Sequence, residues 1–424
     1  MARLAEMPLS AVRRDFHQHP EAGWQEFRTT ALLAEALEEL GFELFLGDDA
    51  LDPTERLGVP PALDLESARE RALDDGAPDS YVREMGEITG LVAVKSYGTE
   101  GPVVGLRVDL DALDQREATD DSHRPAREGF ASKYSNTMHA CGHDGHAAIG
   151  LGVARAIDQD EAFEGTLKLF FQPAEEGGRG GKPMSHSPHL DDVDYLLALH
   201  LGLDNETGTV IAAYENPLPN TKVDVRFIGE PSHAGKSPQD GRNALQALST
   251  AIQNLYAIPR HAGGTTRINV GHVRSDNPQN VISDVAEMRV EVRGGDENLN
   301  EYMLTQARQV LEHAGAMYGV DVETELFGKT ASFVADDECI DAVVRGAEHV
   351  PGATDVVRRR DLGASEDASF LINRVQENGG KATYVGIGAS NPSGHHTSYF
   401  DIDEEALELA TELVHSTILS FERP

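Results

Sequence analysis

Hydrophobic residues recur along the chain with two spacings, one typical of helices and one typical of strands. Between residues 25 and 40 they follow the helical spacing i, i+3, i+4 and stop at Gly41, which predicts a surface helix with one buried face. Helical stretches such as 146–157 alternate with short apolar runs that predict strands. This alternation is typical of an α/β domain with a mostly parallel sheet. The strands are expected at 91–97, 103–110, 166–172 and 195–201.

The pattern changes in the middle of the chain. There the expected elements follow the order strand, helix, strand, strand, helix, strand, which suits a compact two-layer domain. The first pattern then returns, with a helix at 336–350, a strand at 382–389 and a helix at 403–421. We therefore expect a discontinuous parallel-sheet domain, residues 1–216 plus 329–424, interrupted by a β-α-β-β-α-β insert, residues 217–328.

Acidic residues outnumber basic ones, with 72 Asp and Glu against 36 Lys and Arg and a formal net charge of −36. A surface of that sign repels nucleic acid and anionic lipid, which argues against both as partners. Because salt relieves the self-repulsion, we expect a salt-rich cytoplasm, with an ordinary acidic mesophilic protein as the alternative. The acidic, proline-containing segment 47–87 is expected to lie outside the core, with one helical piece at 65–76.

Cysteine content and hydropathy favour a cytoplasmic protein. Cys141 and Cys339 are too few for a disulfide framework, and the first sixteen residues lack the apolar core of a signal peptide. No stretch approaches the roughly 20 apolar residues that a membrane span needs. We expect neither secretion nor membrane insertion.

Potential metal ligands lie where the predicted strands end. The stretch HACGHDGH at 139–146 combines a thiol with imidazoles, donors that suit zinc-like ions. Taken alone, it fits a buried cysteine and a helix-capping histidine equally well. Two adjacent carboxylates, Glu175 and Glu176, follow the strand at 166–172, so that one could face a metal ion and the other a substrate. A solvated acidic turn is the alternative.

Two more groups complete this pattern. His200 lies at the end of an apolar strand, where open α/β sheets place ligand crevices, and His396 lies in the loop after 382–389. Four such groups outside the insert fit a dinuclear metal site better than four unrelated features. Two ions about 3.5–4 Å apart lower the pKa of a shared water and polarise a carbonyl, while a carboxylate acts as general base. The expected reaction is amide hydrolysis, since Cys141 or Ser232 as nucleophile lacks a supporting motif.

Seven motifs resemble the aminoacylase and amidohydrolase branch of the dinuclear-metal exopeptidase family, which includes carboxypeptidase G, peptidase T and indole-acetyl-amino-acid hydrolases. The resemblance covers almost the whole chain and implies two divalent metal ions, zinc or manganese. The motifs are RRDFHQHPE at 13–21, GLRVDLDAL at 105–113, HACGHDGH at 139–146, QPAEEGG at 172–178, SHAG at 232–235, NVIS at 280–283 and the loop HHTSYFDID from 395.

Matched residue by residue, the resemblance also implies roles. Glu175 corresponds to the general base and Asp109 to an orienting aspartate, although Arg107 stands where other branches have a metal-binding histidine. His233 corresponds to a lid histidine that stabilises the oxyanion, often in the site of the neighbouring copy; a plain turn histidine is the alternative. The implied binders of the substrate carboxylate are Asn280 and Arg293, with a surface arginine as the alternative for the latter. The implied metal ligands are Cys141, His143, Glu176, His200 and His396.

Further stretches resemble the p-aminobenzoyl-glutamate hydrolases of this family and carry no obvious catalytic role. They favour cleavage of p-aminobenzoyl-glutamate to p-aminobenzoate and glutamate. The alternatives are a broader N-acyl-amino-acid deacylase and a non-catalytic partner subunit. The insert is implied to be a lid and dimerisation domain, in a homodimer or in a hetero-oligomer with a related second subunit. The stretches are RLGVP at 56–60, ARERALDDGA at 68–77, SHRPAREGFAS at 122–132 and GASEDASFLINRVQ at 363–376.

Overall fold

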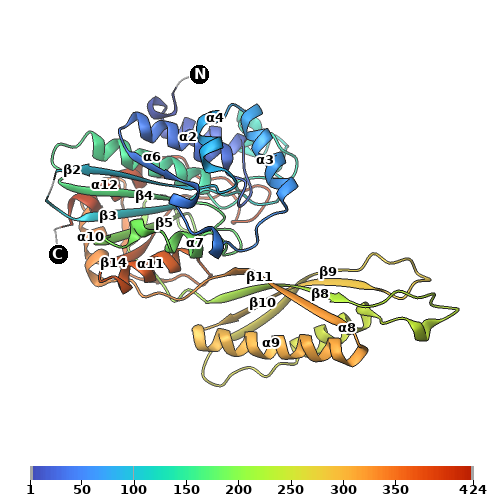
Figure 1. Cartoon of the computed structure of the whole chain (residues 1–424). Helices are drawn as coiled ribbons and strands as arrows, with labels where there is room; N and C mark the ends of the chain where they lie inside the picture. The colour runs from blue at the N-terminus through green and yellow to red at the C-terminus, as the bar shows by residue number, and fades with distance from the viewer. Residues whose placement is uncertain (1–2, 99, 422–424) are drawn as a thin grey trace. The chain divides into compact units, whose positions relative to one another are not determined.

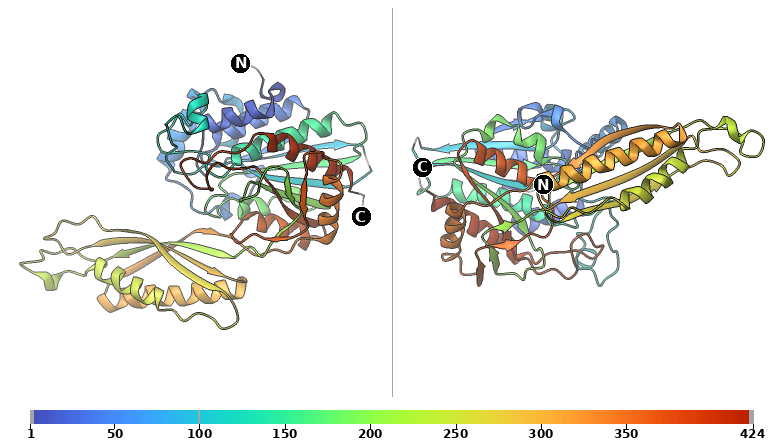
Figure 2. Two further views of the ribbon diagram at one scale, coloured as in Figure 1. Left: turned by 180° about the vertical axis from the view of Figure 1, so that it is seen from behind. Right: turned by 90° about the horizontal axis from the view of Figure 1, so that it is seen from below.

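The computed structural model describes residues 3–98 and 100–421, and the chain forms two compact units (Figures 1 and 2). A large α/β unit and a smaller unit with its own antiparallel sheet confirm the expected fold class. The large unit comprises Met1–Glu215, Phe333–Leu362 and Asp367–Pro424, and the small unit comprises Asn216–Ser332 and Gly363–Glu366.

The large unit is built on an eight-stranded sheet in the order β1-β2-β4-β3-β5-β14-β6-β12. Its central strands β4, β3, β5 and β14 run parallel, whereas β1 and β2 pair antiparallel at one side. The parallel strands are almost entirely buried, as expected for a sheet covered on both faces. The strands span Glu43–Leu46 (β1), Leu91–Tyr97 (β2), Val103–Asp109 (β3), Gly165–Gln172 (β4), Tyr195–Leu201 (β5), Thr209–Ile211 (β6), Asp355–Val357 (β12) and Lys381–Ile387 (β14).

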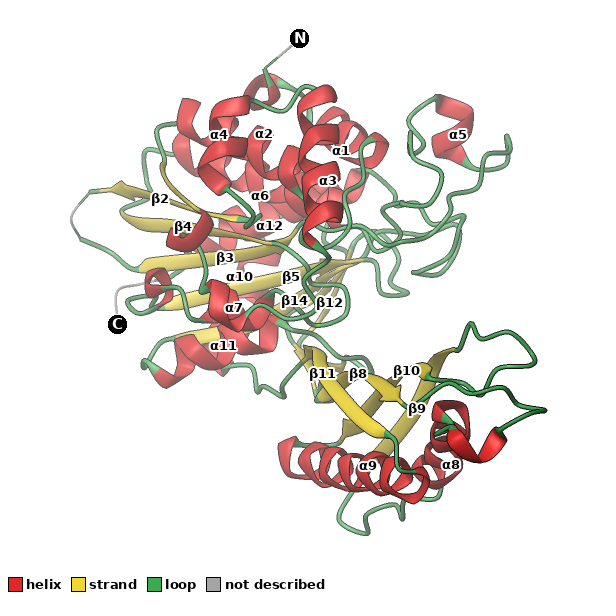
Figure 3. Ribbon diagram, turned by 45° about the vertical axis from the view of Figure 1, so that its right-hand side comes forward, coloured by secondary structure: helices red, strands yellow, loops and turns green. Residues whose placement is uncertain are grey.

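Helices cover both faces of this sheet (Figure 3). One apolar core joins α1, α2, α6, α10 and α12 to the sheet, and a second core on the other face includes α7 and α11. The helices span Leu9–Gln18 (α1), Phe27–Glu39 (α2), Arg124–Glu128 (α5), His143–Asp158 (α6), Gly181–Ser185 (α7), Asp337–Ala347 (α10), Ala368–Glu377 (α11) and Glu405–Leu419 (α12).

The acidic segment 47–87 is not an excursion outside the core, and that expectation is wrong. It forms two helices, α3 (Ala62–Asp74) and α4 (Asp79–Met85), that pack against α2. Ala68 of α3 and Val82 of α4 are 1% exposed or less and belong to the main core. Its acidic residues lie on the outer faces of these helices, which is why composition alone misplaces the segment.

Several helices of the large unit were not predicted, and α1 and α11 are the longest of them. In α1, Arg13 and His17 share the buried face with Leu9, Val12 and Phe16, whose i, i+3, i+7 spacing fits a short helix. In α11, the first turn follows the fully buried Asp367 and lacks a side-chain cap. Both helices pack by apolar side chains, and α1 adds the buried ion pair of Arg13 with Asp144, which a hydrophobic pattern does not report.

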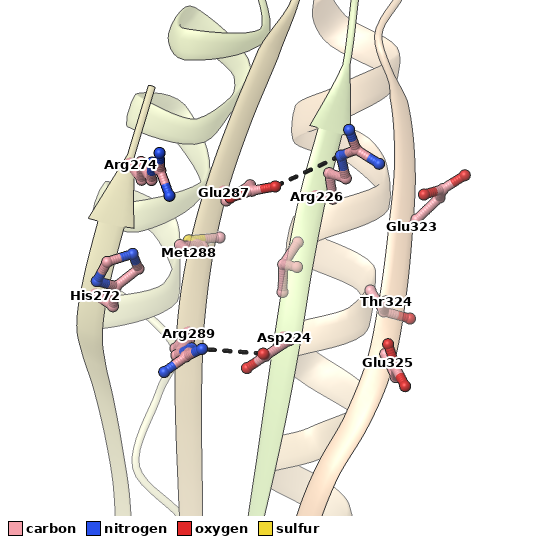
Figure 4. Close-up of a pocket in the computed structure, with 11 residues that line it drawn as sticks. Asp224, Arg226, His272, Arg274, Glu287, Met288, Arg289, Glu323, Thr324 and Glu325 are labelled. Carbon is pink, nitrogen blue, oxygen red and sulfur yellow. Dashed lines mark ion pairs between the residues drawn. The ribbon is translucent and has the colours of Figure 1, made fainter. Parts of the chain in front are cut away.

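The small unit is a four-stranded antiparallel sheet, in the order β11-β8-β10-β9, with α8 and α9 on one face. The other face carries charged side chains, and Figure 4 shows Arg226 facing Glu287 and Arg289 facing Asp224 across neighbouring strands, at 3.6 and 3.5 Å. Such exposed pairs stabilise little and keep the face polar. The elements span Asn220–Ile228 (β8), Ala244–Tyr256 (α8), Thr266–Arg274 (β9), Val285–Gly294 (β10), Glu297–Tyr318 (α9) and Asp321–Lys329 (β11).

None of the helices in the described ranges is long and apolar enough to cross a bilayer. The longest, α9, has 22 residues, but about half of its side chains are polar and lie at the surface of the small unit. Its apolar side contributes Met303, Leu304 and Leu311 to the core of that unit. The helix is therefore an amphipathic element of a globular unit.

Candidate metal and catalytic site

The carboxyl ends of the parallel strands bring seven of the candidate side chains together in the large unit. β3 ends at Asp109, β4 leads into Glu175 and Glu176, and β5 carries His200. Overlapping groups of donor atoms, each within 4.8 Å of one another, connect the set. The set consists of Asp109, Cys141, His143, Glu175, Glu176, His200 and His396.

Hydrogen bonds decide which histidines can offer a nitrogen to a metal ion. The His146 Nε2 accepts from the Leu201 N–H at 2.9 Å, so its Nδ1–H donates to Asp109 at 2.5 Å and both nitrogens are in use. The His200 Nδ1–H donates to the Leu201 carbonyl at 2.7 Å, which leaves Nε2 facing the Cys141 Sγ at 3.5 Å. The buried His143 lies between two carboxylates, with its Nδ1 3.3 Å from Asp111 and its Nε2 3.7 Å from Asp109; burial opposes a positive charge on this imidazole, but its acidic neighbours raise its pKa. The His200 Nε2 is thus prepared as a ligand, His143 is a ligand candidate by its place among the donor groups, and His146 is an orienting group.

The surroundings of His396 favour a positive charge. Its Nε2 lies 3.2 Å from Glu176, and interactions with Cys141 and Glu176 raise the pKa of the imidazole to about 10. Its backbone has φ 59°, and its N–H donates to the Ala140 carbonyl at 2.8 Å. A non-glycine residue in this left-handed region is held by its surroundings and is often found at functional sites.

The donor set fits divalent metal ions. Thiolate, imidazole and carboxylate are zinc donors, and two ligands bound at about 2.1 and 2.3 Å in tetrahedral geometry lie about 3.6 Å apart, close to the Cys141–His200 separation of 3.5 Å. Burial keeps the pKa of His200 well below its usual value, so this imidazole is neutral, as a ligand must be. Cys141 with His143 and His200, and Cys141 with Glu176 and His396, form two overlapping groups that share the thiol.

A turn after β4 presents Glu175 and Glu176, and buried carboxylates hold its backbone. Asp111 accepts the N–H groups of both glutamates at 3.0 Å. Glu26 accepts the N–H of Ala174 at 2.7 Å, and Ala174 has φ 50°. The two glutamate side chains are half-buried, which leaves them accessible to a small substrate.

A buried ionic network lies beside the metal-ligand candidates. Arg13 donates to Asp144 at 2.7 Å and lies 2.9 Å from Asp401. His17 bridges Asp144 at 2.7 Å and Glu117 at 3.0 Å. Asp144 follows His143 in α6, and Asp401 belongs to the loop that carries His396, so the network joins the two segments.

Opposite charges set the protonation states of this network. Burial and the charge of Arg13 oppose protonation of His17, but hydrogen bonds to Asp144 and Glu117 outweigh them and raise its pKa. Burial acts against ionisation of Glu117, yet hydrogen bonds from His123 and His17 lower the pKa of this carboxyl to about 2. The contact between them therefore favours the charged form of both groups.

The small unit places its three candidate residues in two locations. His233 and Asn280 lie in adjacent loops joined by the bridge between His233 and Val281. The His233 Nδ1 accepts the N–H groups of Gly235 and Lys236 at 3.1 Å, so Nε2 carries the proton and the exposed ring is a donor. Arg293 lies eight residues along β10 from Val285, or about 27 Å at 3.4 Å per residue, at the opposite end of the sheet.

Several buried groups beside the site were not predicted. His146 and Asp111 orient candidate residues, and Arg107 donates to Asp109 at 2.8 Å in the fully buried interior. Both nitrogens of His139 lack a hydrogen-bond partner among the described residues, and burial lowers its pKa to about 3. These residues belong to the quoted motifs, but only their long-range contacts distinguish their roles.

The fold and the cluster of donors define the chain as a metal-dependent amidohydrolase. Residues 105–420 match the family described as peptidase family M20/M25/M40, and the chain belongs to that family. The sequence is 43% identical, over 97% of this chain and 95% of its relative, to the indole-3-acetyl-aspartic acid hydrolase of Enterobacter agglomerans. It is 42% identical, with the same coverage, to one of the subunits of the p-aminobenzoyl-glutamate hydrolase of Escherichia coli.

Solved structures agree with this assignment. An aminobenzoyl-glutamate utilization protein from Klebsiella pneumoniae superposes with a TM-score of 0.84 at 37% identity, covering 97% of this chain and 95% of that one. A Bacillus subtilis protein described as a dinuclear metal-binding peptidase of the M20 family gives 0.64 at 25% identity, covering 97% and 96%. Together with the donor groups, these likenesses support divalent metal ions as cofactors.

Proposed function

We propose that the chain hydrolyses p-aminobenzoyl-glutamate to p-aminobenzoate and glutamate. The observation that carries this proposal is the 42% identity over 97% of the chain to a hydrolase named for that substrate. The 43% identity to an indole-3-acetyl-aspartic acid hydrolase makes a broader deacylase of N-acyl acidic amino acids the second candidate. Both named substrates join an aromatic acyl group to an acidic amino acid.

The proposed reaction uses Glu175 as general base and Cys141, His143, Glu176, His200 and His396 as metal ligands. Divalent ions held by these ligands, zinc or manganese, would supply Lewis-acid chemistry, making a water more acidic and polarising the amide carbonyl. Glu175 takes the proton of the attacking water and delivers it to the amide nitrogen as the C–N bond breaks. Asp109 holds His146 and lies 3.7 Å from His143, and so orients the cluster.

The proposal gives the small unit the role of a lid and dimerisation domain, residues 217–328, set in a catalytic domain of residues 1–216 plus 329–424. The Nε2–H of His233 donates to the oxyanion, and Asn280 and Arg293 bind the substrate's carboxylate groups. Local positive charge is required for this step because the net charge of −36 repels a dianionic substrate at long range.

We propose further that two copies form a homodimer; the alternative partner is a related second subunit. His233 and Asn280 lie in loops at the Val285 end of the sheet, and Arg293 lies about 27 Å along β10 from Val285, too far for one small unit to place all three on one small substrate. Mixing the inactive variants Glu175→Gln and His233→Ala tests this. Mixed dimers that share residues between copies recover about a quarter of the wild-type activity, whereas no recovery refutes sharing.

A substrate panel tests the chemistry. The purified chain, loaded with zinc or manganese at high salt, is assayed on p-aminobenzoyl-glutamate, indole-3-acetyl-aspartate, and N-acetyl and N-benzoyl amino acids. We expect the highest kcat/KM for p-aminobenzoyl-glutamate; equal or better turnover of the others would favour the broader deacylase. Glu175→Gln should lower kcat by about 10²–10⁴-fold with bound metal unchanged. Normal turnover by this variant would remove Glu175 as the base, and no turnover by the wild type would favour a non-catalytic partner subunit.

A further inference from the structure

Asp367 occupies a position that the proposed reaction does not use. It lies in the stretch at 363–376, just before α11, and its side chain is fully buried. One carboxylate oxygen accepts the N–H groups of Gly180 and Gly181 at 3.1 and 2.7 Å. The other accepts from the Gln172 side-chain amide at 2.7 Å and from the Arg107 guanidinium at 3.3 Å. Four donors from three chain segments therefore meet on one carboxylate.

Arg107 and Gln172 close this arrangement into a ring. The Arg107 Nε donates to the Gln172 side-chain oxygen at 2.9 Å, and another of its nitrogens donates to Asp109 at 2.8 Å. Arg107 and Gln172 have no exposed surface, like Asp367. A buried ionic group that loses its partner is strongly unfavourable, so the three side chains fix one another's positions.

The ring holds both ends of the turn that carries Glu175 and Glu176. Gln172 is the last residue of β4, immediately before the turn, and Gly180 and Gly181 lie immediately after it. A Cβ on Gly180 would lie 1.7 Å from the Pro173 carbonyl oxygen, and one on Gly181 would lie 2.2 Å from that of Asp367. These approaches are possible only for glycine and bring the two ends of the turn together.

We propose that Asp367 is a positioning residue for hydrolysis, acting through Arg107, Gln172 and the turn at 173–181 on Glu175 and Glu176. The inference rests on the proposed role of Glu175 as base. Asp367 holds the two ends of the turn together through its hydrogen bonds to Gln172, Gly180 and Gly181. Arg107, which it also binds, in turn fixes the position of Asp109 at the end of β3. A carboxylate oxygen of Asp367 also lies within 4.8 Å of one of Glu175, so the stretch at 363–376 reaches the proposed base itself.

A purely structural role is the competing interpretation, and Asp336 provides the matched control. Its carboxylate also accepts from a glutamine side chain, Gln376 at 2.7 Å, and from a backbone N–H, that of Ala382 at 2.9 Å. It lies 3.8 Å from Lys381, at the amino end of β14, the end opposite the candidate site. Replacing Asp336 disturbs the same kind of contact without touching the turn.

The experiment compares Asp367→Ala with Asp336→Ala in the full-length, metal-loaded enzyme. We expect Asp367→Ala to lower kcat by about 10–100-fold with KM changed by less than about threefold, and to speed amide hydrogen exchange at Gly180 and Gly181. Asp336→Ala should leave kcat and that exchange unchanged. Asp367→Asn, whose amide oxygen still accepts the glycine N–H groups, should recover part of the loss and serves as the test variant if the alanine variant does not fold.

A double-mutant cycle separates positioning from general loss of structure. In the Glu175→Gln background, Asp367→Ala should cost little further activity because the group being positioned is already disabled. An equal cost in both backgrounds, an equal effect of Asp336→Ala, or wild-type kcat in both Asp367 variants would overturn the inference. Normal turnover by Glu175→Gln alone would instead refute the proposed base, so the two failures are distinguishable.

Discussion

In the large unit seven candidate side chains converge at the ends of parallel strands, whereas in the small unit three candidates lie at opposite ends of one sheet. The first set is mostly buried and tied to partners such as Asp111 and His146. In the second set, His233 and Asn280 are exposed in loops. The large unit fixes the geometry of its candidates by folding, whereas the small unit leaves His233 and Asn280 exposed and apart from Arg293.

Metal removal is the strongest test of this contrast. Chelation should abolish activity, and zinc or manganese should restore it, because the donor groups of the large unit fit divalent cations and the proposed reaction uses them. Hydrogen exchange should increase at 139–146, 172–181 and 394–401 and stay unchanged in the small unit. Full activity after verified metal removal would contradict the metal-dependent mechanism.

His233→Ala is expected to lower kcat by about 10²–10³-fold because one donor to the oxyanion is lost. Bound metal and thermal stability should not change, since His233 is exposed and bonds only within its own loop. His272, an exposed histidine on the charged face in Figure 4, is the matched control. If His272→Ala lowers kcat equally, a specific role for His233 is wrong.

Arg293→Gln should raise KM by about 10–100-fold with a smaller change in kcat, because it removes a charged partner of the substrate carboxylate. Arg267, directly opposite Arg293 on β9 and exposed, provides a control of equal charge. Steady-state kinetics of Arg267→Gln should match the wild type. If Arg293→Gln leaves KM unchanged, Arg293 does not bind the substrate, and its role is structural, through its contacts with Glu291 and Ser365.

The buried network of the large unit predicts a bell-shaped dependence of stability on pH. The pKa of Glu117 is about 2 in the folded state, below its ordinary 4.5, so its contribution is complete above pH 4.5 and lost as pH falls towards 2. The pKa of His17 is raised above 6.5, so its contribution is complete below pH 6.5 and lost as pH rises through the raised value.

Denaturant unfolding from pH 2 to 9 checks this dependence. Glu117→Gln should cost about 3 kcal/mol at pH 6 and flatten the acid side of the curve. His17→Gln should flatten the alkaline side. Acid and alkaline slopes equal to those of the wild type would show that the network does not control stability.

Salt should have the smallest effect, mainly on exposed charges. Raising KCl from 0.1 to 1 M should increase Tm by roughly 5 °C as self-repulsion from the net charge of −36 is screened. The exposed ion pairs Arg226–Glu287 and Arg289–Asp224 on the open face of the small unit gain no stability from the added salt. Full stability and activity in dilute buffer would count against the proposed salt-rich environment.

The large unit's candidates could be located from the sequence because strand ends are readable from short apolar runs. His200 and Glu175 follow such runs directly, and the parallel topology then brings them together. The distinction between His146 and His200 was not readable, since it depends on which nitrogen meets Leu201. One-dimensional spacing carries no information about that hydrogen bond.

Polar residues that act through distant contacts also escaped prediction. Asp367 accepts a hydrogen bond from Arg107, which lies 260 positions away in the sequence, and Asp144 accepts one from Arg13, 131 positions away. In α1, the contacts of Arg13 and His17 escape prediction for the same reason, although Leu9, Val12 and Phe16 lie on the same buried face. Hydrophobic periodicity finds elements that pack by apolar burial and overlooks those that pack by ion pairs.

The position of β14 has a consequence for how the protein is made. It lies between β5 and β6 in the sheet, although the entire small unit separates it from both in the sequence. During synthesis the edge of β5 stays unpaired until Lys381–Ile387 has left the ribosome, which makes folding of the large unit late and dependent on long-range pairing. His396 follows β14, so a nascent chain cannot assemble the complete donor cluster before all strands of the large sheet have been synthesised.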